Sequence, residues 1–298
     1  MDTPLFTIAH ISDLHFSKIQ LGIAQFMSKR WIGNLNVIFN RGRIYKNSRP
    51  RTLIESFKKN NVTHVFISGD VSTTSFKKEF QVAKNFVKDL RDEGFIVFVI
   101  PGNHDSYTKR SYKKRLFYNY FDDEHDEKID FSLKNDFVSA LNIGKGHWLV
   151  RIDTTYPAPV YLSTGQYTDT IDKNLNDLLK KIPKEDHIIM MNHYPLFHHE
   201  HPRRILLGAD HLRKTISKYP NIKFYLHGHT HRNTIADLRS SSLPIVLDSG
   251  SCSHAKRGSW NLIKVFDNSC SVEVYKCNNQ ENPPYWDLCK SQSFTSND

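Results

Sequence analysis

The sequence FIVFVIPGNHD, residues 95–105, decides the fold of this chain. Its first six residues form an unbroken apolar run of β-branched and aromatic residues, which predicts a strand buried in a covered sheet. A proline and a glycine end the run, and Asn103, His104 and Asp105 follow directly. An open α/β sheet places its chemistry at the carboxyl ends of its strands. Asn103 can offer a carbonyl oxygen to a metal ion, His104 can move a proton, and Asp105 can hold the imidazole.

Four other segments repeat this arrangement of a predicted strand followed by polar side chains. The strands are expected at residues 5–11, 62–68, 187–192 and 222–226, and the polar residues that follow them are Asp13 and His15, Asp70, His193, and His229 and His231. Asp13 and His15 are two residues apart, so in an extended chain both side chains point to the same side. Because all five strand ends belong to one layered sheet, we expect their polar side chains to converge at one edge.

The order of the predicted elements indicates an α/β protein with a mostly parallel layered sheet. Amphipathic helices are expected between the strands, at residues 76–93, 172–182 and 209–219. The segments 244–248, 259–266 and 271–276 look like closing antiparallel strands, and the polar tail from about residue 278 is expected to be irregular. The sequence contains no internal repeat and no linker, which predicts a single domain over residues 1–298.

Composition limits the class of protein. The chain has 298 residues, 39% of them hydrophobic and 24% charged, which is typical of a soluble globular protein. No apolar run reaches the ~20 residues of a membrane span, and Asp2 stands where a secretory signal would be basic. Four cysteines without a CxxC pair favour free thiols in a reducing compartment, so we expect a cytoplasmic protein. The net charge of +10 favours an anionic partner.

The segment from Leu14 to Ile54 carries no acidic residue and is too long for an ordinary βα loop. We interpret its middle, at about residues 17–51, as a basic insertion. Its basic residues are Lys18, Lys29, Arg30, Arg41, Arg43, Lys46, Arg49 and Arg51, and its apolar residues include Leu21, Phe26, Trp31, Ile38 and Phe39. Two interpretations remain open: an element that faces a membrane surface or another anion, peripheral to the inner membrane, and a helical excursion packed on the domain with a basic rim.

Several histidines are expected to have structural or surface roles. His10, His64 and His187 lie inside predicted strands and are expected to be satisfied core or edge histidines. His198, His199 and His201 follow His193 closely and are expected in a surface loop.

The residues at the strand ends have the chemistry of a metal site. Carboxylate, amide oxygen and imidazole together suit borderline ions such as Mn, Fe or Zn. About seven candidate ligands are too many for one tetrahedral ion and enough for two divalent ions that share a bridge. Asp70 is the expected bridge, because a carboxylate has two oxygens. Two ions ~3.5–4 Å apart can activate a water and clamp an in-line displacement at phosphorus.

In this pattern the chain resembles the calcineurin-like metallophosphoesterase family. The ordered signature of that family, D-x-H, GD, GNH(D/E), H and GHxH, is complete here between Ile8 and Arg232. The resemblance implies a four-layer αββα metallophosphoesterase sandwich with a dinuclear site. The implied ligands are Asp13, His15 and His231 for one ion and Asn103, His193 and His229 for the other, with Asp70 bridging. His104 would protonate the leaving group, and Asp105 would orient His104.

The resemblance implies a hydrolase that acts on a phosphodiester. The form of the motif that contains His104 is similar to that of the branch with bacterial cyclic-nucleotide phosphodiesterases. The expected substrate is therefore a cyclic nucleotide or another small, nucleotide-like phosphodiester. Two alternatives are a lipid-pathway phosphohydrolase or pyrophosphatase at the membrane surface, and a non-enzymatic metal-bound scaffold. A nucleic-acid partner is favoured by charge alone, because no RNA-binding signature is present.

Overall fold

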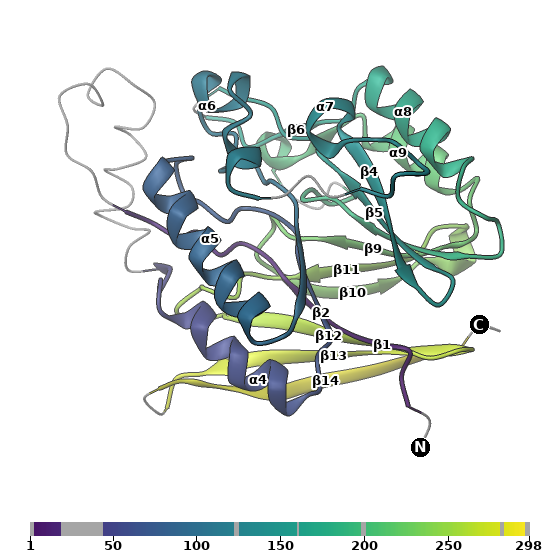
Figure 1. Cartoon of the computed structure of the whole chain (residues 1–298). Coiled ribbons are helices and arrows are strands. Elements are labelled where there is room, and N and C mark those ends of the chain that lie inside the picture. The colour runs from purple at the N-terminus through teal and green to yellow at the C-terminus, as the bar shows by residue number, and fades with distance from the viewer. Residues whose placement is uncertain are drawn as a thin grey trace.

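The computed structural model describes residues 3–18, 44–121, 125–159, 161–197, 201–280 and 283–295. Two six-stranded sheets pack face to face, and helices cover their outer sides (Figure 1). The predicted four-layer αββα architecture is therefore confirmed. The first sheet has the strand order β14-β13-β12-β1-β2-β3, and the second has the order β10-β11-β9-β7-β5-β4.

The first sheet combines a parallel half and an antiparallel half. Its strands are β1 (Phe6–Ile11), β2 (His64–Ile67), β3 (Ile96–Val99), β12 (Ser259–Val265), β13 (Ser269–Asn278) and β14 (Tyr285–Thr295). Strands β1, β2 and β3 run parallel, whereas β12, β13 and β14 continue the sheet from β1 as antiparallel neighbours. The covering helices are α4 (Leu53–Lys59), preceded by the 3-10 turn η2 (Arg49–Thr52), and α5 (Lys77–Asp92).

The second sheet is parallel in its centre and antiparallel at both edges. Its strands are β4 (Val138–Gly144), β5 (His147–Ile152), β7 (His187–Met191), β9 (Ile222–His227), β10 (Asn233–Asp237) and β11 (Ile245–Ser249). The pairs of β5 with β7, β7 with β9 and β9 with β11 are parallel. Helices α8 (Asp169–Leu179) and α9 (Ala209–Ile216) cover its outer side (Figure 1).

Shorter elements connect the layers. They are α6 (Lys109–Lys113), η3 (Leu116–Asn119), α7 (Leu133–Asp136), η4 (Pro202–Arg204), η5 (Arg239–Ser241), and the paired two-residue strands β6 (Gly165–Gln166) and β8 (Leu206–Leu207).

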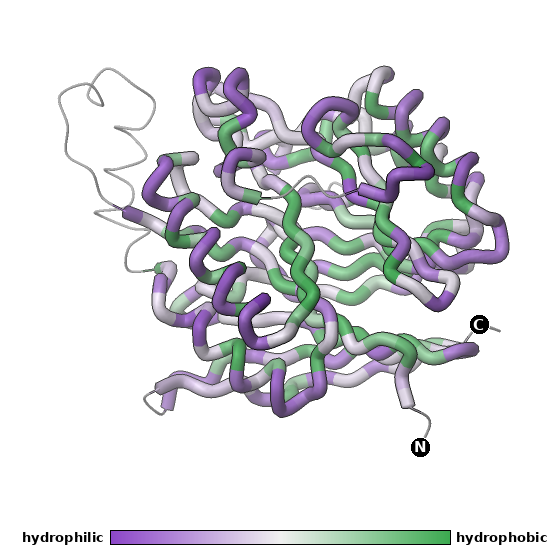
Figure 2. Tube along the Cα trace, viewed as in Figure 1, coloured by the Kyte–Doolittle hydropathy of each residue, from purple (hydrophilic) through white to green (hydrophobic). Residues whose placement is uncertain are grey.

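Apolar side chains fill the space between the two sheets and the space under the helices. Ile8, Phe66, Leu149 and Leu226 belong to the cluster between the sheets and are fully buried. The alternate residues of the same strands, such as Ala9, pack under the helices. Each central strand is therefore covered on both faces, which explains the unbroken apolar runs in the sequence. The trace is green along these strands and mixed with purple along the helices (Figure 2).

The structure corrects three expectations. The ligand-bearing strands belong to two sheets rather than one, and antiparallel pairing extends beyond the segments 259–266 and 271–276, where it was predicted correctly, to β14, β4 and β10. The segment expected to close the fold antiparallel at 244–248 contains β11, which pairs antiparallel with β10 as expected but runs parallel to β9. The tail expected to be irregular contains β14, an edge strand with only Trp286 and Phe294 buried. With so few buried side chains, its hydrophobic alternation is too weak to read from sequence.

Most of the basic insertion, residues 19–43, lies outside the described residues. Its end is described: Lys46 N–H donates to the Ser253 carbonyl at 2.9 Å, and Tyr45 pairs with His254 as an isolated antiparallel bridge. Among the described residues, the helices are too short or too polar to cross a membrane.

Candidate metal centre

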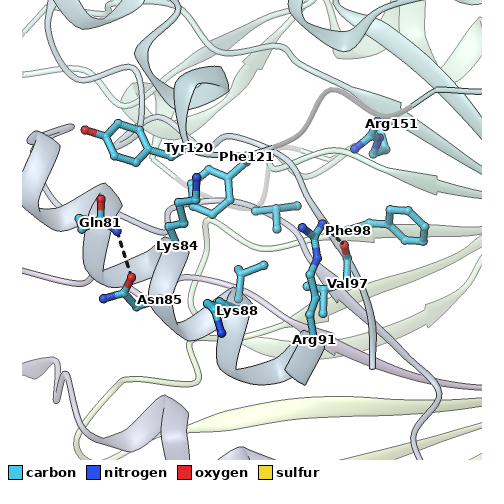
Figure 3. A pocket seen from close by; sticks show the side chains of 12 residues that line it. Gln81, Lys84, Asn85, Lys88, Arg91, Val97, Phe98, Tyr120, Phe121 and Arg151 are labelled. Carbon is cyan, nitrogen blue, oxygen red and sulfur yellow. Dashed lines mark hydrogen bonds between the residues drawn. The ribbon is translucent and has the colours of Figure 1, made fainter. Parts of the chain in front are cut away.

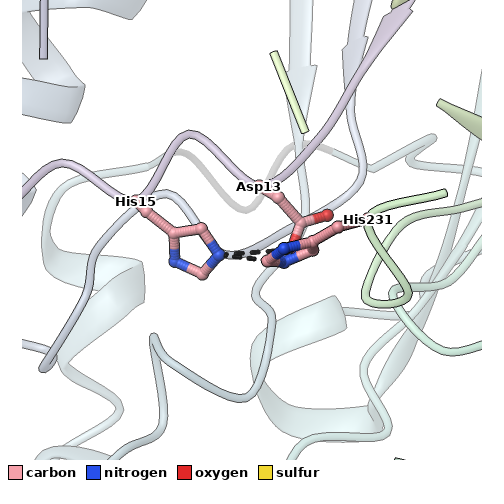
Figure 4. Close-up of side chains that lie close together, drawn as sticks. All are labelled: Asp13, His15 and His231. Atoms are coloured by element: carbon pink, nitrogen blue, oxygen red, sulfur yellow. Dashed lines mark hydrogen bonds and ion pairs between the residues drawn. The ribbon is translucent and has the colours of Figure 1, made fainter. Parts of the chain in front are cut away.

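Three of the predicted ligands come together from the loops after β1 and β9. Oδ1 of Asp13 lies 2.9 Å from Nε2 of His231 and 3.5 Å from Nε2 of His15. The two imidazole nitrogens are 3.2 Å apart, and Figure 4 shows the three side chains facing one another. We call these three residues the Asp13 triad.

Three further predicted ligands, Asn103, His193 and His229, form a second group, which we call the Asn103 triad. Oδ1 of Asn103 lies 3.2 Å from Nε2 of His193 and 2.9 Å from Nδ1 of His229. Asp70 lies between the triads, because its Oδ2 is 3.4 Å from Nε2 of His193 and 3.9 Å from Nε2 of His15. The structure thus brings all seven sequence-predicted ligands to one edge of the two sheets.

These separations fit the coordination of divalent ions. Ligand atoms at ~2.0–2.2 Å from one ion lie about 3.0–3.4 Å from each other, close to the distances within each triad. Burial lowers the pKa of His229 to about 3, so its imidazole is neutral and can offer a lone pair. Burial raises the pKa of Asp70, but the neighbouring His193 and His104 outweigh it and hold the pKa below its usual range. A neutral imidazole at His229 and an ionised carboxylate at Asp70 are donors that suit Mn, Fe or Zn. Burial lowers the pKa of His193, but the Asp70 charge outweighs it and raises the pKa to about 9, so this imidazole must lose a proton when it binds an ion.

The main chain at the ligands is strained. Asp13, His15, Asp70, His229 and His231 all have left-handed backbone conformations, with φ between 45° and 70°. Such values are uncommon for residues with a side chain and are concentrated at functional sites. They also correct one expectation: the loop after β1 is not extended, and the side chains of its two ligands converge through left-handed turns.

Two glycines of the motifs are required by close approach to the ligands. Gly69 has φ of 104°, and a Cβ there would lie 2.6 Å from Nδ1 of His193. At Gly228 a Cβ would collide with the Ser12 hydroxyl and the Asp13 carboxylate. The motifs therefore need glycine because the ligand side chains occupy the space of a Cβ.

Main-chain carbonyls fix the imidazoles of the Asn103 triad. Nδ1 of His193 donates to the Ser68 carbonyl at 2.7 Å, which directs Nε2 toward Asn103 and Asp70. Nε2 of His229 donates to the Arg204 carbonyl at 3.1 Å, which directs Nδ1 inward. A hydrogen bond at the outer nitrogen sets the tautomer and raises the basicity of the inner nitrogen.

His104 lies beside the two triads. Its Nδ1 donates to the Thr73 carbonyl at 2.6 Å, and its main-chain N–H donates to Oδ1 of Asp70 at 2.7 Å. Its ring stands edge-on to His15, with centroids 5.0 Å apart, and stacks on Tyr107 at 5.7 Å. These contacts hold the ring at the bridging carboxylate, with a ring nitrogen within 4.8 Å of ligand atoms of His15 and Asp70.

Asp105 has a different set of contacts from the predicted one. The family signature implies that this carboxylate orients His104, but Nδ1 of the His104 ring bonds the Thr73 carbonyl instead. The Asp105 carboxylate accepts hydrogen bonds from the N–H groups of Gly102, Val71 and Ser72 and from the Ser72 hydroxyl, at 2.7–3.1 Å. It therefore joins the loop that carries Asp70 to the loop that carries Asn103. Burial and the Asp70 charge raise its pKa to about 7, and the four donors favour its ionised form.

The sequence reasoning missed three supports of the site. The Ser251 and Ser253 hydroxyls donate to the Asp13 carbonyl at 2.8 and 3.0 Å. The Tyr45 hydroxyl lies 2.9 Å from Nδ1 of His231. The run Gly-Ser-Cys-Ser after β11 is a further set of small polar residues at a strand end, and this signal could have identified the two serines.

The histidines expected in strands belong to neither triad, but Nδ1 of His10 and Nδ1 of His187 have no hydrogen-bond partner among the described residues, so full satisfaction was wrongly expected there. Nε2 of His10 is 2.9 Å from the Ser68 hydroxyl, and Nδ1 of His64 is 2.8 Å from the Thr63 hydroxyl. Burial lowers the pKa of His64 and of His227 to about 4. His198 and His199 lie outside the described residues, and His201 is exposed.

Two cavities lie away from the ligands. One, of about 310 Å³, lies between α5 and the edge strand β3 and includes Lys84, Phe98 and Arg151 among its lining side chains (Figure 3). The other, of about 610 Å³, lies where β7, β9 and β11 begin and is lined in part by His187, Phe224 and Ile245. Neither includes a predicted ligand, so the candidate site is defined by side-chain convergence rather than by cavity size.

Two facing mixed sheets, flanked by helices and carrying these histidine–carboxylate clusters, define a metallophosphoesterase fold with metal-binding potential. The chain belongs to the calcineurin-like phosphoesterase family, whose model matches residues 6–233. Family membership supports a hydrolase with a metal centre, as the motifs predicted.

Solved structures share the fold at low sequence identity. A dimetal phosphatase from Danio rerio is 12% identical, with 98% of this chain and 99% of that chain covered and a TM-score of 0.66. A purple acid phosphatase from yellow lupin (Lupinus luteus) seeds is 10% identical, with 99% of this chain and 54% of that chain covered and a TM-score of 0.62. Among curated protein sequences, none matches this chain.

Proposed function

We propose that this protein hydrolyses a small phosphodiester, such as a cyclic nucleotide, with two divalent ions held by the Asp13 and Asn103 triads. The observation that carries the proposal is the position of His104, whose ring lies at the bridging Asp70 and against His15. A proton donor beside a bridged pair of metal sites is the arrangement needed to expel an alkoxide from phosphorus.

The two triads and Asp70 would hold the ions, and the substrate phosphate would lie over them. When bound, two such ions supply a nucleophile from water at neutral pH and neutralise charge on the phosphoryl oxygens. The chain contributes the rest. The buried Asp70 carboxylate lies between the two triads, close to His15 and His193. The Ser68 and Arg204 carbonyls hold the imidazoles of His193 and His229 in one tautomer.

His104 would pass a proton to the leaving oxygen. Its Nδ1 is engaged by the Thr73 carbonyl, so Nε2 is the nitrogen from which a proton can be transferred. An alkoxide such as the ribose oxygen of a cyclic nucleotide is a poor leaving group and gains most from protonation. This need favours an alkyl phosphodiester over an aryl ester as the natural substrate.

The test uses the metal-free protein reloaded with Mn²⁺. Turnover of bis(4-nitrophenyl) phosphate, 4-nitrophenyl phosphate, and 2′,3′- and 3′,5′-cyclic nucleotides is compared under identical conditions. We expect hydrolysis of the diesters to exceed that of the monoester, and Asp70→Asn to abolish it. Preferred hydrolysis of the monoester would refute the phosphodiester assignment. Absence of turnover with every ester, from protein that binds two ions, would favour the scaffold alternative.

A further inference from the structure

Tyr45 is an aromatic residue outside the ligand motifs that contacts two predicted ligands of one triad. Its hydroxyl oxygen lies 2.9 Å from Nδ1 of His231, and its ring lies against His15, with centroids 4.4 Å apart. The side chain is half-buried. It comes from the end of the long segment between β1 and η2, which enters the sheet edge beside the Asp13 triad.

The main chain of Tyr45 is held by the same loop that supports Asp13. Ala255 N–H donates to the Ile44 carbonyl at 2.6 Å, and Lys46 N–H donates to the Ser253 carbonyl at 2.9 Å. The Ser253 hydroxyl in turn donates to the Asp13 carbonyl at 3.0 Å. The position of Tyr45 is therefore coupled to the Asp13 triad by short, direct contacts.

The buried Arg49 strengthens this attachment. Its guanidinium donates to the His254 carbonyl and to the Asn279 side chain. A tyrosine on a freely moving loop would lose much of its orienting effect, because the loop would have to be ordered each time the contact formed. Here two main-chain hydrogen bonds and an arginine anchor hold its backbone beforehand.

The hydrogen-bond geometry determines what Tyr45 does to His231. Nε2 of His231 faces Oδ1 of Asp13 and Nε2 of His15, at 2.9 and 3.2 Å, so it is the nitrogen that can bind an ion. The proton of the neutral ring then belongs on Nδ1, where the Tyr45 oxygen accepts it. A partner at the outer nitrogen fixes the ring orientation and raises the basicity of the inner nitrogen.

We propose that Tyr45 is a positioning residue for the metal ligand His231, and that it selectively sets the affinity of the ion held by the Asp13 triad. The inference rests on the proposed two-ion centre and adds to it a residue from outside the family signature. It also links the basic insertion to the metal edge through a described contact. A phenol oxygen is a weaker acceptor than the carbonyls that serve the Asn103 triad, so the Asp13 triad should hold the weaker of two ions.

The experiment is a calorimetric titration of the metal-free protein with Mn²⁺, which has no substrate and needs no activity. Three variants are compared with the natural protein. Tyr45→Phe removes the hydroxyl and keeps the ring, and Tyr45→Leu removes both. Tyr275→Phe is the matched control, because it removes a hydroxyl bonded to Asn60 at 2.7 Å and to Glu273 at 3.1 Å, neither of which belongs to a ligand motif.

We expect two binding steps in the natural protein. Tyr45→Phe should weaken only the weaker step, by about 10-fold, the lower end of the range for such outer partners. Tyr45→Leu should weaken it further, and Tyr275→Phe should change neither step. The urea midpoint of the metal-free Tyr45→Phe protein should stay at the natural value, which separates positioning from loss of fold.

Unchanged affinities in Tyr45→Phe, or equal weakening of both steps, would overturn the role of Tyr45 and leave the two-ion centre intact. A lowered urea midpoint that accompanies a weaker step would also overturn it, in favour of a structural role. Fewer than two ions bound by the natural protein would overturn the proposed function itself, and the Tyr45 proposal with it.

Discussion

The two triads contain similar ligands and differ in what holds them. In the Asn103 triad, main-chain carbonyls of Ser68 and Arg204 orient both imidazoles, and the ligands are buried. In the Asp13 triad, His231 is oriented by the Tyr45 side chain and is 26% exposed. Nδ1 of His15 is buried and has no hydrogen-bond acceptor among the described residues.

This difference suggests that the Asn103 triad is held rigidly and that the Asp13 triad is adjustable. The Ser68 carbonyl follows β2 and cannot be displaced without disturbing the first sheet, and the Arg204 carbonyl belongs to the main chain of η4. The contact to His231 is made by a single side chain, that of Tyr45, which a substitution can remove without changing the main chain. Outer partners of ligands affect metal affinity by about 10–100-fold. We therefore expect the Asn103 triad to bind its ion tightly and the Asp13 triad to bind an exchangeable one.

The largest effect on metal content and turnover is expected at Asp70, which lies between the two triads. Asp70→Asn removes one anionic oxygen from the carboxylate that lies between the triads, within 3.4 Å of His193 and 3.9 Å of His15. It should lose at least one ion and reduce turnover by roughly 10³-fold or more, because the charge shared by two ions is removed. Elemental analysis and steady-state rates measure both. Full metal content with a normal rate would rule out the bridge.

His104→Ala separates catalysis from metal binding. Because His104 lies beside the triads rather than within them, both binding steps should be preserved. The rate should fall by about 10²–10⁴-fold, the usual contribution of general acid catalysis. The loss should shrink for diesters with nitrophenol leaving groups. The same loss for nitrophenyl and alkyl diesters would argue against proton donation.

A pair of ligand variants tests the comparison itself. His193→Ala should abolish the tight binding step, and His231→Ala should abolish only the weak step, since each removes an imidazole from one triad. Each affinity should fall by about 100-fold or more, above the loss caused by an outer partner. Titration with Mn²⁺ distinguishes the steps. Reversed assignments would mean that main-chain support does not set affinity here.

Asp105→Asn probes the link between two ligand loops. Two of the four donors that surround the carboxylate would then face an amide N–H₂ group, which cannot accept a hydrogen bond. A buried group left without its partner costs about 1–3 kcal/mol. Urea unfolding of the metal-free protein should show a loss of this size. A stability equal to that of the natural protein would show that the loops do not depend on this carboxylate.

The smallest effect is expected at His64, where β2 begins, at the end of the strand opposite the ligands. The dependence of folding stability on the protonation of His64 serves as a reference for both triads. Burial lowers the pKa of His64 to about 4, against 6.5 in the unfolded chain. The unfolded chain therefore binds the proton first, so this stabilisation is complete above pH 6.5 and is lost as the pH falls toward 4. About 1–2 kcal/mol is expected after allowance for solvent at the ring.

His64→Gln should remove that pH dependence and leave metal binding unchanged. Urea unfolding of the metal-free natural and variant proteins at pH 7 and pH 5 provides the measurement. If the two proteins lose equal stability between these pH values, the ring is not the group responsible.

Much of the fold and site followed from sequence because the apolar strands and the polar residues after them are local patterns. Runs such as 95–100 are long enough to predict a strand covered on both faces, and the polar residues after five such strands could be expected to converge. The pairing of the ligands was also implied by the family signature. The structure brings these side chains together as that signature implies.

What could not be predicted depends on non-local geometry. The left-handed conformations of Asp13 and His15 arise from loops that fit against neighbouring strand ends, so the two side chains converge although the backbone between them is not extended. Tyr45 belongs to no motif, and only the folded chain places it at His231. The edge strand β14 buries too few side chains for a period-two pattern to stand out.

The central claim is that two ions bind on either side of Asp70. Anomalous diffraction from crystals soaked in Mn²⁺ tests it most directly, because it locates each ion among the side chains. We predict two peaks about 3.5–4 Å apart. One should be held by Asp13, His15 and His231, the other by Asn103, His193 and His229, with Asp70 contacting both. A single peak, or two peaks of which neither contacts Asp70, would contradict the account.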